Sequence, residues 1–230
     1  MQELNNKKTH DSKDSLKVQL DEKKADFESK ADSHIKKIYK EGIDSVQQSG
    51  VLSKALKIGD IAPNFILNNA VGAPIALYDL LNKGKVILTW YRGGWCPYCN
   101  LTLLQLQKEL SNFKTYGAQL LALTPELPDN SLNTSEKNNL KFEVLSDVGN
   151  KIAEAYGILF KLTDEVAKSY NKSFDLNNHN GDKSNELPLA ATYIIDKDAK
   201  INYVFLDADY RNRAEPSELT RFLKTERQSI

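Results

Sequence analysis

Two cysteines, Cys96 and Cys99, are the only thiols of this 230-residue chain, and they stand three positions apart within TWYRGGWCPYCN at 89–100. A pair with this spacing can close a disulfide, supply two ligands to a metal ion or carry out thiol redox chemistry. A structural zinc site needs further ligands, and the histidines of the chain are scattered rather than set at a ligand-like spacing. The pair therefore predicts redox chemistry that uses neither a metal nor another cofactor.

The residues around the pair place it at the start of a helix. KVILTWY at 85–91 is an unbroken apolar run, which is typical of a central strand buried on both faces. Pro97 suits the first turn of the helix that follows, because its missing N–H is harmless there. Cys96 is then expected at the helix N-terminus, where free N–H groups and the helix dipole favour a thiolate. Cys99 would lie one turn further along the same face, within reach of a disulfide.

Four neighbouring residues are candidates for a substrate pocket. Gly93 and Gly94 allow a sharp turn and leave bare backbone for a small substrate to approach. Arg92 would stabilise a thiolate, or the negative charge that develops on a leaving oxygen, although its position alone is equally consistent with an ordinary surface arginine. Trp95 would shield the site from water or simply pack in the core.

Composition and charge exclude several classes of partner. The 31 basic residues balance the 31 acidic residues, so no net charge favours binding to nucleic acid or to an anionic membrane. No stretch reaches the roughly 18 apolar residues of a membrane span, and the first residues contain no apolar segment typical of a secretion signal. A lone Cys-X-X-Cys pair in such a chain favours a reducing compartment over a secreted disulfide framework. We therefore expect a cytoplasmic protein with no nucleic-acid or membrane partner.

Beyond the N-terminal region, short apolar runs alternate with helical patterns. Strands are expected at 85–91, 118–125, 142–147, 192–196 and 201–207, and helices through 103–113, 152–156 and 215–226. The last two strands flank a short polar turn that signals a hairpin. The polar, turn-rich segment 171–187 is expected to run over the surface. This order predicts an α/β fold with a mixed central sheet flanked by helices.

The N-terminal region differs in composition from the rest of the chain. Residues 1–55 are densely charged, and apolar side chains recur at helical spacing from Leu16 to Val46. Ser15 is a candidate helix cap. We expect a charged helical extension over 1–55, followed by a single domain over 56–230. The apolar stripe would pack against that domain or, as the alternative, contact a second subunit in a homodimer.

Long stretches of the chain resemble a known family. The resemblance is carried by WYRGGWCPYCNLTLLQLQ, IGDIAPNFILNNAVG, TPELPDNSLNTSEKN, LSDVGNKIAEAYG, LPLAATYIID and DADYRNRAEP. Together they are similar to the peroxiredoxin-like branch of the alkyl hydroperoxide reductase/thiol-specific antioxidant (AhpC/TSA) family. The resemblance implies a thioredoxin-like fold and thiol-dependent reduction of hydrogen peroxide and organic hydroperoxides. It also implies a cycle through sulfenic acid and an intramolecular disulfide, with thioredoxin or a low-molecular-weight thiol as the reductant.

The resemblance leaves the roles of the two cysteines open. The last residue of the family motif P-x-x-x-T-x-x-C attacks peroxide, and on this chain that position holds Cys99. Cys96 then occupies the threonine position and Arg92 the proline position. By the logic of thioredoxins the attacking thiol is instead Cys96, the cysteine at the helix tip. The arginine that usually completes the peroxide pocket is missing from its expected place, so Arg211 or Arg213 is the candidate replacement.

Thioredoxins and glutaredoxins supply the competing function, since their signatures also contain WC-x-x-C and CPYC. These exchange enzymes place a cis-proline just before the strand expected at 192–196, where this chain has Ala190, with Pro188 two residues earlier. A non-proline cis bond costs roughly 3–4 kcal/mol, so Ala190 is expected to be trans. The missing cis-proline favours a peroxidase over a thiol-disulfide exchange enzyme. A third alternative is a scaffold with no catalytic activity.

Overall fold

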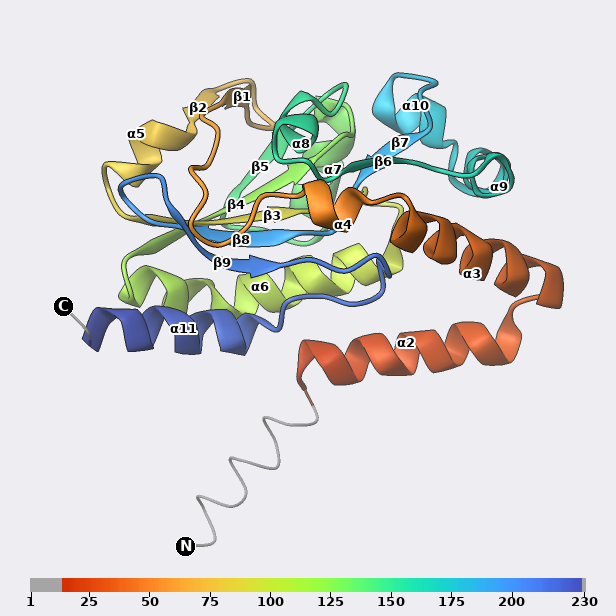
Figure 1. Cartoon of the computed structure of the whole chain (residues 1–230), viewed down its shortest axis with the longest axis horizontal. Helices are drawn as coiled ribbons and strands as arrows, with labels where there is room; N and C mark the ends of the chain where they lie inside the picture. The colour runs from red at the N-terminus through yellow and green to blue at the C-terminus, as the bar shows by residue number, and fades with distance from the viewer. Residues whose placement is uncertain (1–13, 229–230) are drawn as a thin grey trace, which may run out of the picture.

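The computed structural model describes residues 14–228 and has one central sheet covered by helices (Figure 1). Its strands are β3 (Lys85–Trp90), β4 (Ala118–Thr124), β5 (Glu143–Ser146), β8 (Thr192–Ile195) and β9 (Ile201–Phe205). They lie in the order β5-β4-β3-β8-β9. β3 is parallel to β4 and antiparallel to β8, and β8 and β9 form an antiparallel hairpin. The five expected strands and the mixed sheet are therefore confirmed.

One face of the sheet is covered by two long helices. α6 (Pro97–Thr115) and α11 (Pro216–Gln228) lie side by side beneath the strands in the view of Figure 1. Ile87 of β3 packs in a buried cluster with Leu106 of α6 and Leu219 of α11. Both helices match the sequence prediction, because apolar residues at helical spacing must bury one face against the sheet.

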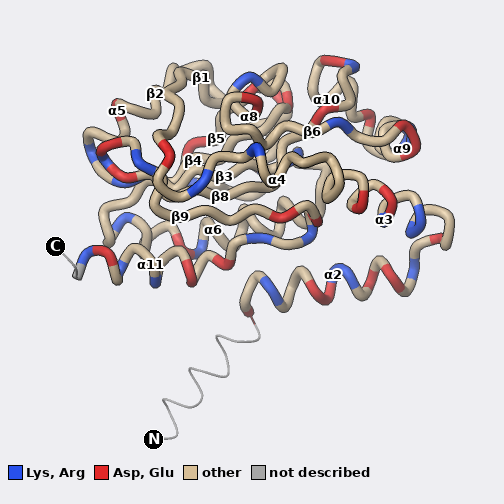
Figure 2. The backbone as a smooth tube through the Cα atoms, in the orientation of Figure 1, with Lys and Arg blue, Asp and Glu red and all other residues tan. Residues whose placement is uncertain are grey.

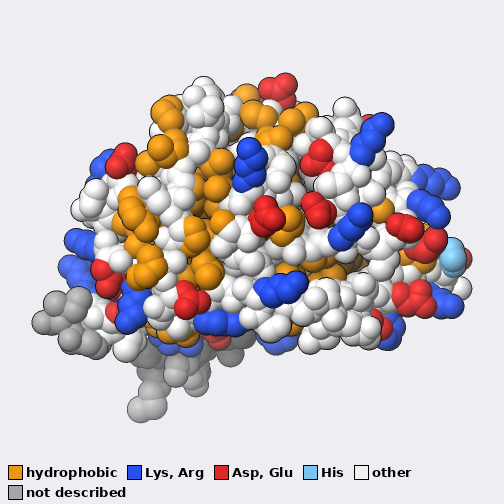
Figure 3. Space-filling model, turned by 45° about the horizontal axis from the view of Figure 1, so that its top comes forward, with side chains coloured by type: hydrophobic (Ala, Val, Ile, Leu, Met, Phe, Trp, Pro, Cys, Tyr) orange, Lys and Arg blue, Asp and Glu red, His pale blue; other side chains and the backbone are white. Residues whose placement is uncertain are grey.

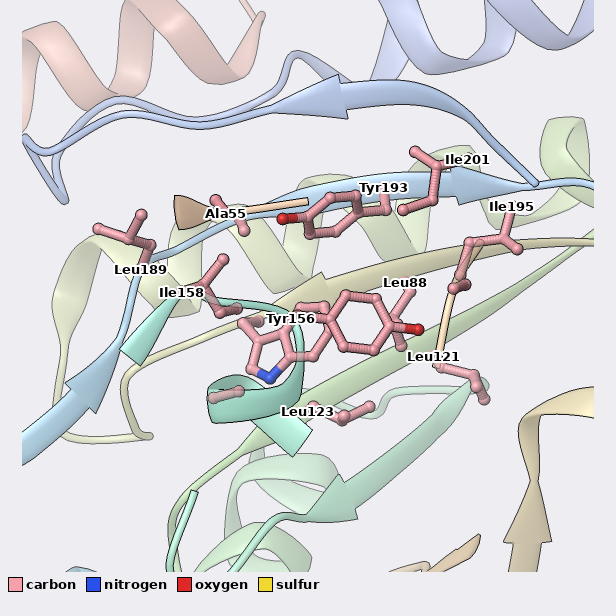
Figure 4. Close-up of a cluster of buried hydrophobic side chains, with 14 of the residues drawn as sticks. Ala55, Leu88, Leu121, Leu123, Tyr156, Ile158, Leu189, Tyr193, Ile195 and Ile201 are labelled. Carbon is pink, nitrogen blue, oxygen red and sulfur yellow. The ribbon is translucent and has the colours of Figure 1, made fainter. Parts of the chain in front are cut away.

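The opposite face of the sheet carries an aromatic core. Side chains alternate along a strand, so Leu88 and Trp90 of β3 face away from α6. The rings of Trp90 and Tyr156 lie 4.9 Å apart, and Tyr156 lies 5.5 Å from Tyr193 of β8 (Figure 4). Tyr156 directly follows α8 (Lys151–Ala155), the short helix expected from the sequence. The chain also contains the short helices α4 (Val51–Lys54) and α5 (Leu77–Leu81) and the helix α7 (Pro128–Lys137). Asn138, directly after α7, donates from Nδ2 to Oδ1 of Asn100 in α6 at 3.1 Å.

The charged N-terminal stripe forms two helices in place of one continuous helix. α2 (Leu16–Lys30) begins after Ser15, whose hydroxyl accepts a hydrogen bond from the first turn, as expected for a cap. α3 (Ser33–Gln48) begins after Asp32, whose carboxylate accepts a hydrogen bond from the N–H of His34 at 2.7 Å. A second cap in the middle of the stripe therefore divides it into a helical hairpin.

The apolar sides of α2 and α3 pack against other elements of the same chain. Leu16 and Leu20 of α2 are buried in the cluster that contains Cys96 and Cys99, and α2 contacts α6. α3 packs in the same way on α9 (Asp164–Phe174). Acidic and basic residues alternate along both helices (Figure 2). The structure thus supports packing of the stripe on its own domain.

The segment 171–187 lies mostly at the surface, as expected, but it contains regular secondary structure in place of loops. The segment contains the end of α9, the short helix α10 (Leu176–Asn180) and β7 (Glu186–Pro188), and β7 pairs with β6 (Leu159–Lys161). Leu176 is 1% exposed. The few apolar residues of the segment lie where they can pack against the rest of the protein. Because most of the other residues are polar, the sequence shows no clear helical or strand periodicity here.

The segment before β3 keeps several large hydrophobic side chains at the surface. It includes a hairpin of β1 (Ile66–Asn68) and β2 (Pro74–Ala76). The exposed residues here are Ile58, Ile61, Ile66, Val71 and Tyr78. Figure 3 shows hydrophobic side chains gathered on the face that carries these elements. None of the helices between residues 14 and 228 combines the length and the apolar character that a bilayer crossing requires.

Candidate active site

The junction of β3 and α6 positions both cysteines. Cys96 is the residue that precedes α6, Pro97 occupies its first turn, and the N–H of Cys96 donates to the carbonyl of Gly93 at 3.1 Å. Both thiols are free and buried, with Cys96 1% and Cys99 0% exposed. Cys96 therefore stands at the start of the helix, as expected, but the position is buried and not open to solvent. It is buried because α2, far away in the sequence, packs over this junction.

The surroundings of Cys99 favour its ionised form, the thiolate. Its Sγ accepts a hydrogen bond from the backbone N–H of Arg92 and another from Nη2 of Arg213, each at 3.4 Å. Burial alone would raise the pKa of Cys99. The hydrogen bond from Cys96 and the positive charges of Arg213 and Arg92 outweigh burial and lower the pKa to about 5.

Cys96 has the opposite character. Burial, together with the hydrogen bond to Cys99 and the charge of that neighbour, raises its pKa well above the ordinary value. Its side chain also accepts no hydrogen bond from the first turn of α6, so the free helical N–H groups do not stabilise a thiolate there. The thiolate expected on Cys96 is therefore placed on Cys99, with Cys96 as its protonated neighbour.

Two arginines lie against the cysteines, and a third does not. Arg92 is 2% exposed, and its guanidinium lies 4.0 Å from the ring centroid of Tyr210. Arg213 contacts Cys99 and also lines a surface depression of about 520 Å³ between α2 and the start of α11. Arg211 instead pairs with Asp209 through Nε and Nη2, each at 2.9 Å. Of the two candidate replacements for the missing family arginine, the structure brings Arg213 to the sulfur.

The glycines before Cys96 are required by close contacts. A Cβ atom on Gly94 would lie 2.1 Å from Oγ1 of Thr134, and one on Gly93 would lie 2.1 Å from Nε1 of Trp95. The carbonyl of Gly94 accepts a hydrogen bond from Nδ2 of Asn100 at 2.8 Å. The turn that leads into the cysteine pair is therefore packed too tightly for any side chain at these two positions.

Trp95 packs against two aromatic side chains of α9. Its ring stacks on Phe174 with centroids 5.2 Å apart and lies 5.3 Å from Tyr170, both in α9. The side chain is half-buried, and it flanks the guanidinium of Arg92 at 5.1 Å. Trp95 thus packs as a core residue and also covers the site on this side.

Two further residues at this turn were missed by the sequence analysis. Glu126 is 0% exposed, and its Oε2 accepts a hydrogen bond from the N–H of Gly94 at 2.9 Å. Nδ1 of His179 lies 3.1 Å from Oε1 of Glu126, and this carboxylate raises the pKa of His179. Glu126 stands two residues after the end of β4, which is the one signal in the sequence that could have identified it. His179 lies in α10, a helix that the sequence analysis did not predict.

The backbone near Ala190 agrees with the sequence prediction. No cis peptide bond occurs in residues 14–228, so Ala190 is trans. Over the same residues, no group of three or more His, Cys, Asp or Glu side chains is arranged to hold a metal ion.

Comparison with solved structures identifies the fold. The peroxidoxin BcpB from Mycobacterium tuberculosis matches with a TM-score of 0.59 at 20% identity, over 74% of this chain and 97% of that one. A peroxiredoxin-like protein from Aquifex aeolicus matches with a TM-score of 0.57 at 18% identity, over 74% of this chain and 88% of that one. The expected thioredoxin-like fold is therefore confirmed.

Comparison with curated relatives and family models identifies the family. Peroxiredoxin Bcp of Escherichia coli is 28% identical over 66% of this chain and 86% of its own length. A Buchnera aphidicola relative, also named as a bcp peroxiredoxin, is 35% identical over 45% of this chain, and the match spans 65% of that relative. The thiol-disulfide oxidoreductase ResA of Bacillus thuringiensis is 26% identical over 64% of this chain and 68% of its own length. The family model matches residues 58–204, and the chain belongs to the AhpC/TSA family.

Proposed function

We propose that the protein is a thiol-dependent peroxidase that reduces hydrogen peroxide and organic hydroperoxides. The observation that carries this proposal is the environment of Cys99. Its Sγ receives two hydrogen bonds, from the Arg92 backbone and the Arg213 guanidinium, and its pKa is lowered to about 5. A thiolate is the nucleophile that attacks peroxide, so this cysteine is ionised and ready at neutral pH.

In the first step, the Cys99 thiolate attacks one oxygen of the peroxide. An S–O bond forms, the O–O bond breaks, and the leaving oxygen takes up a proton to depart as water or an alcohol. The positive charge of Arg213 faces the place where negative charge moves from sulfur to oxygen, so it stabilises the transition state. Peroxide would enter through the depression of about 520 Å³ that Arg213 lines.

In the second step, Cys96 resolves the sulfenic acid. Its sulfur attacks Sγ of Cys99, the S–OH bond breaks, and the thiol proton leaves with the hydroxyl group as water. The two side chains lie in the same buried cluster, one helical turn apart at the start of α6, which is a spacing compatible with the 96–99 disulfide. Thioredoxin or a low-molecular-weight thiol then reduces this disulfide, and no cofactor takes part.

The relatives support the same assignment, and the remaining parts of the proposal follow from the cycle. Peroxiredoxin Bcp of Escherichia coli carries the activity in its name.

The reducing cytoplasm is the compartment in which thioredoxin and small thiols can complete each turnover. We place the peroxidase domain at 56–230 and the helical extension at 1–55, and association into a homodimer would use surface outside the occupied α2–α3 stripe.

A thiol-disulfide oxidoreductase is the second candidate function. It is favoured by the similarity to ResA and by the Cys-X-X-Cys pair at the start of a helix. Two observations weigh against it. Cys96, the usual attacking thiol in such enzymes, is buried and has a raised pKa, and no proline between residues 14 and 228 follows a cis peptide bond.

The decisive experiment is to treat the Cys96→Ser and Cys99→Ser variants with one equivalent of peroxide and to analyse both by mass spectrometry with a sulfenic-acid trap. We expect Cys96→Ser to trap sulfenic acid at Cys99 and Cys99→Ser to trap little. Trapping on Cys96 alone would reverse the assigned roles. Rapid reduction of insulin by a wild-type protein that does not consume peroxide would favour the oxidoreductase instead.

A further inference from the structure

The backbone of Gly94 is held from both sides by side chains. Its N–H donates to Oε2 of Glu126 at 2.9 Å, and its carbonyl accepts a hydrogen bond from Nδ2 of Asn100 at 2.8 Å. The same Nδ2 also donates to the carbonyl of Cys96 at 3.2 Å. These contacts of Glu126 and Asn100, here called the Gly94 clamp, fix the backbone directly before the cysteine pair.

Glu126 is a buried carboxylate whose own position is fixed by α10. Its side chain is 0% exposed, and its Oε1 lies 3.1 Å from Nδ1 of His179, a distance at which a protonated imidazole pairs with a carboxylate. The carbonyl of His179 in turn accepts hydrogen bonds from the N–H of Leu127 at 2.9 Å and from Nδ2 of Asn130 at 3.1 Å. A hydrogen bond to an ionised carboxylate is roughly twice as strong as one between neutral groups, so Glu126 is a rigid anchor for the turn.

The two cysteines depend on this turn to different degrees. Cys96 is the N-cap of α6, and its backbone is extended, with φ −88° and ψ 115°, so the turn and not the helix directs its side chain. Cys99 lies within α6, where the helix restricts the direction of its side chain. Its Sγ also accepts hydrogen bonds from the N–H of Arg92 and from Nη2 of Arg213, which lie outside the Gly94 clamp. Loosening the clamp should therefore displace Sγ of Cys96 more than Sγ of Cys99.

We propose that Glu126 and Asn100 are positioning residues for Cys96, which hold its sulfur in place to attack the sulfenic acid on Cys99. In that step an S–S bond forms, the S–OH bond breaks, and the thiol proton of Cys96 leaves with the hydroxyl group as water. Glu126 and Asn100 act through the backbone of the turn, since neither side chain makes a hydrogen bond to sulfur within residues 14–228. The inference rests on the proposed function, and it concerns only the second step of that cycle.

The test measures the two steps separately in the full-length protein. Reduced protein is mixed rapidly with hydrogen peroxide and quenched at intervals, and mass spectrometry follows first the sulfenic acid and then the disulfide. Glu126→Met removes the acceptor of the Gly94 N–H and should slow disulfide formation about tenfold or more, because reacting groups that are misplaced by about 1 Å lose much of their rate. Formation of the sulfenic acid should stay within about twofold of the wild type, since the contacts that ionise Cys99 are unchanged.

The conservative variant Glu126→Gln distinguishes positioning from mere filling of space. The amide keeps an oxygen that can accept from the Gly94 N–H, so most of the rate of disulfide formation should return. Equal rates of disulfide formation in Glu126→Met and the wild type would overturn the proposal. Slowing of both steps to the same extent would also contradict it, because that result indicates a general loss of structure.

Asp147→Leu is the matched control for the loss of a buried carboxylate. Asp147 is 2% exposed, and its Oδ2 accepts hydrogen bonds from the N–H groups of Ile152 at 3.1 Å and Ala153 at 2.9 Å. It anchors the start of α8 and takes no part in the Gly94 clamp. This variant should therefore be less stable, yet its disulfide should form at a rate within about twofold of the wild type, as expected for sites that share no partner.

Asn100→Ala tests the other side of the clamp, and it decides the question if Glu126→Met does not fold. This substitution removes the hydrogen bonds to the carbonyls of Gly94 and Cys96 and leaves the buried carboxylate in place. It should slow disulfide formation and spare the formation of sulfenic acid. An unchanged second step in Asn100→Ala would overturn the proposal.

A second oxidant separates this inference from the peroxidase assignment. The Cys99 thiolate attacks dipyridyl disulfide and releases one pyridinethiolate, and Cys96 then attacks the mixed disulfide, closes the 96–99 bond and releases a second one together with its own proton. A slower second release in Glu126→Met, in a protein that is inert toward peroxide, would keep the inference and remove the peroxidase. Rapid consumption of peroxide with equal second rates in the wild type and both clamp variants would keep the peroxidase and overturn the inference.

Discussion

Nη2 of Arg213 lies 3.4 Å from Sγ of Cys99, although 114 residues separate them in the chain. Arg213 stands between β9 and α11, whereas Cys99 lies in the first turns of α6. The contact therefore forms only when the C-terminal hairpin and helix have packed beside α6. It brings a cation to a buried sulfur and helps to make that sulfur an anion.

Removal of the Arg213 charge should raise the pKa of Cys99. In Arg213→Gln we expect an increase of about one unit, equivalent to about 1.4 kcal/mol of lost thiolate stabilisation. The measurement is the rate of iodoacetamide alkylation of Cys99 against pH in a Cys96→Ser background. Arg221→Gln is the control, because Arg221 lines the same surface depression and makes no contact with sulfur. Identical pH profiles for the two arginine variants would contradict the prediction.

The reduced protein should become more stable as the pH rises from about 5 to 9.0. Over this window the Cys99 thiol is ionised in the folded state and protonated in the unfolded state, so unfolding takes up a proton. The stabilisation is complete above the ordinary pKa and is lost as the pH falls through the lowered one. The expected slope is at most about 1.4 kcal/mol per pH unit.

This slope is measured by urea denaturation under reducing conditions and compared with that of Cys99→Ser. The comparison is needed because His179 titrates in the same range with the opposite sign. Its raised pKa gives stability that is present at low pH and lost as the pH rises. Equal slopes in the wild type and in Cys99→Ser would show that Cys99 is not the thiolate.

Alanine at position 94 should disturb the turn before Cys96. Its Cβ would lie 2.1 Å from Oγ1 of Thr134, so either the turn or α7 must shift. Gly94→Ala should reduce peroxidase turnover at least tenfold and destabilise the fold by about 1–3 kcal/mol. The added substitution Thr134→Ala removes the clashing atom and should restore part of both losses. If turnover in the double variant is no better than in Gly94→Ala, the clash is not the cause.

The docking of α2 should control how easily reagents reach the cysteines. Leu16 and Leu20 are 1% and 3% exposed and are the buried residues of α2. Replacing both with alanine should weaken the docking by about 4 kcal/mol or more, because each buried leucine contributes about 2–5 kcal/mol. We expect alkylation of Cys99 to accelerate at least tenfold. The exposed Glu22→Ala is the control, and equal rates in the two variants would show that α2 does not protect the pair.

The local patterns of the sequence were sufficient to predict the order of strands and helices and the position of the Cys96–Cys99 pair. The apolar run at 85–91, Pro97 and the leucines that follow predict a buried strand leading into a helix, and this is the observed junction of β3 and α6. These signals are local, since strand and helix periods depend on neighbouring residues. The helix and strand within 171–187 could not be predicted in this way, because they are stabilised mainly by tertiary contacts.

The ionisation of the pair was decided by the tertiary structure. The sequence placed Cys96 at a helix tip and predicted a thiolate there, whereas the fold buries it under α2 and gathers Arg92 and Arg213 around Cys99. Burial and the approach of distant charges set a pKa, and neither can be read from residue spacing. The sequence by itself therefore determined where the two sulfurs stand, and the packing of distant segments decided which of them is the anion.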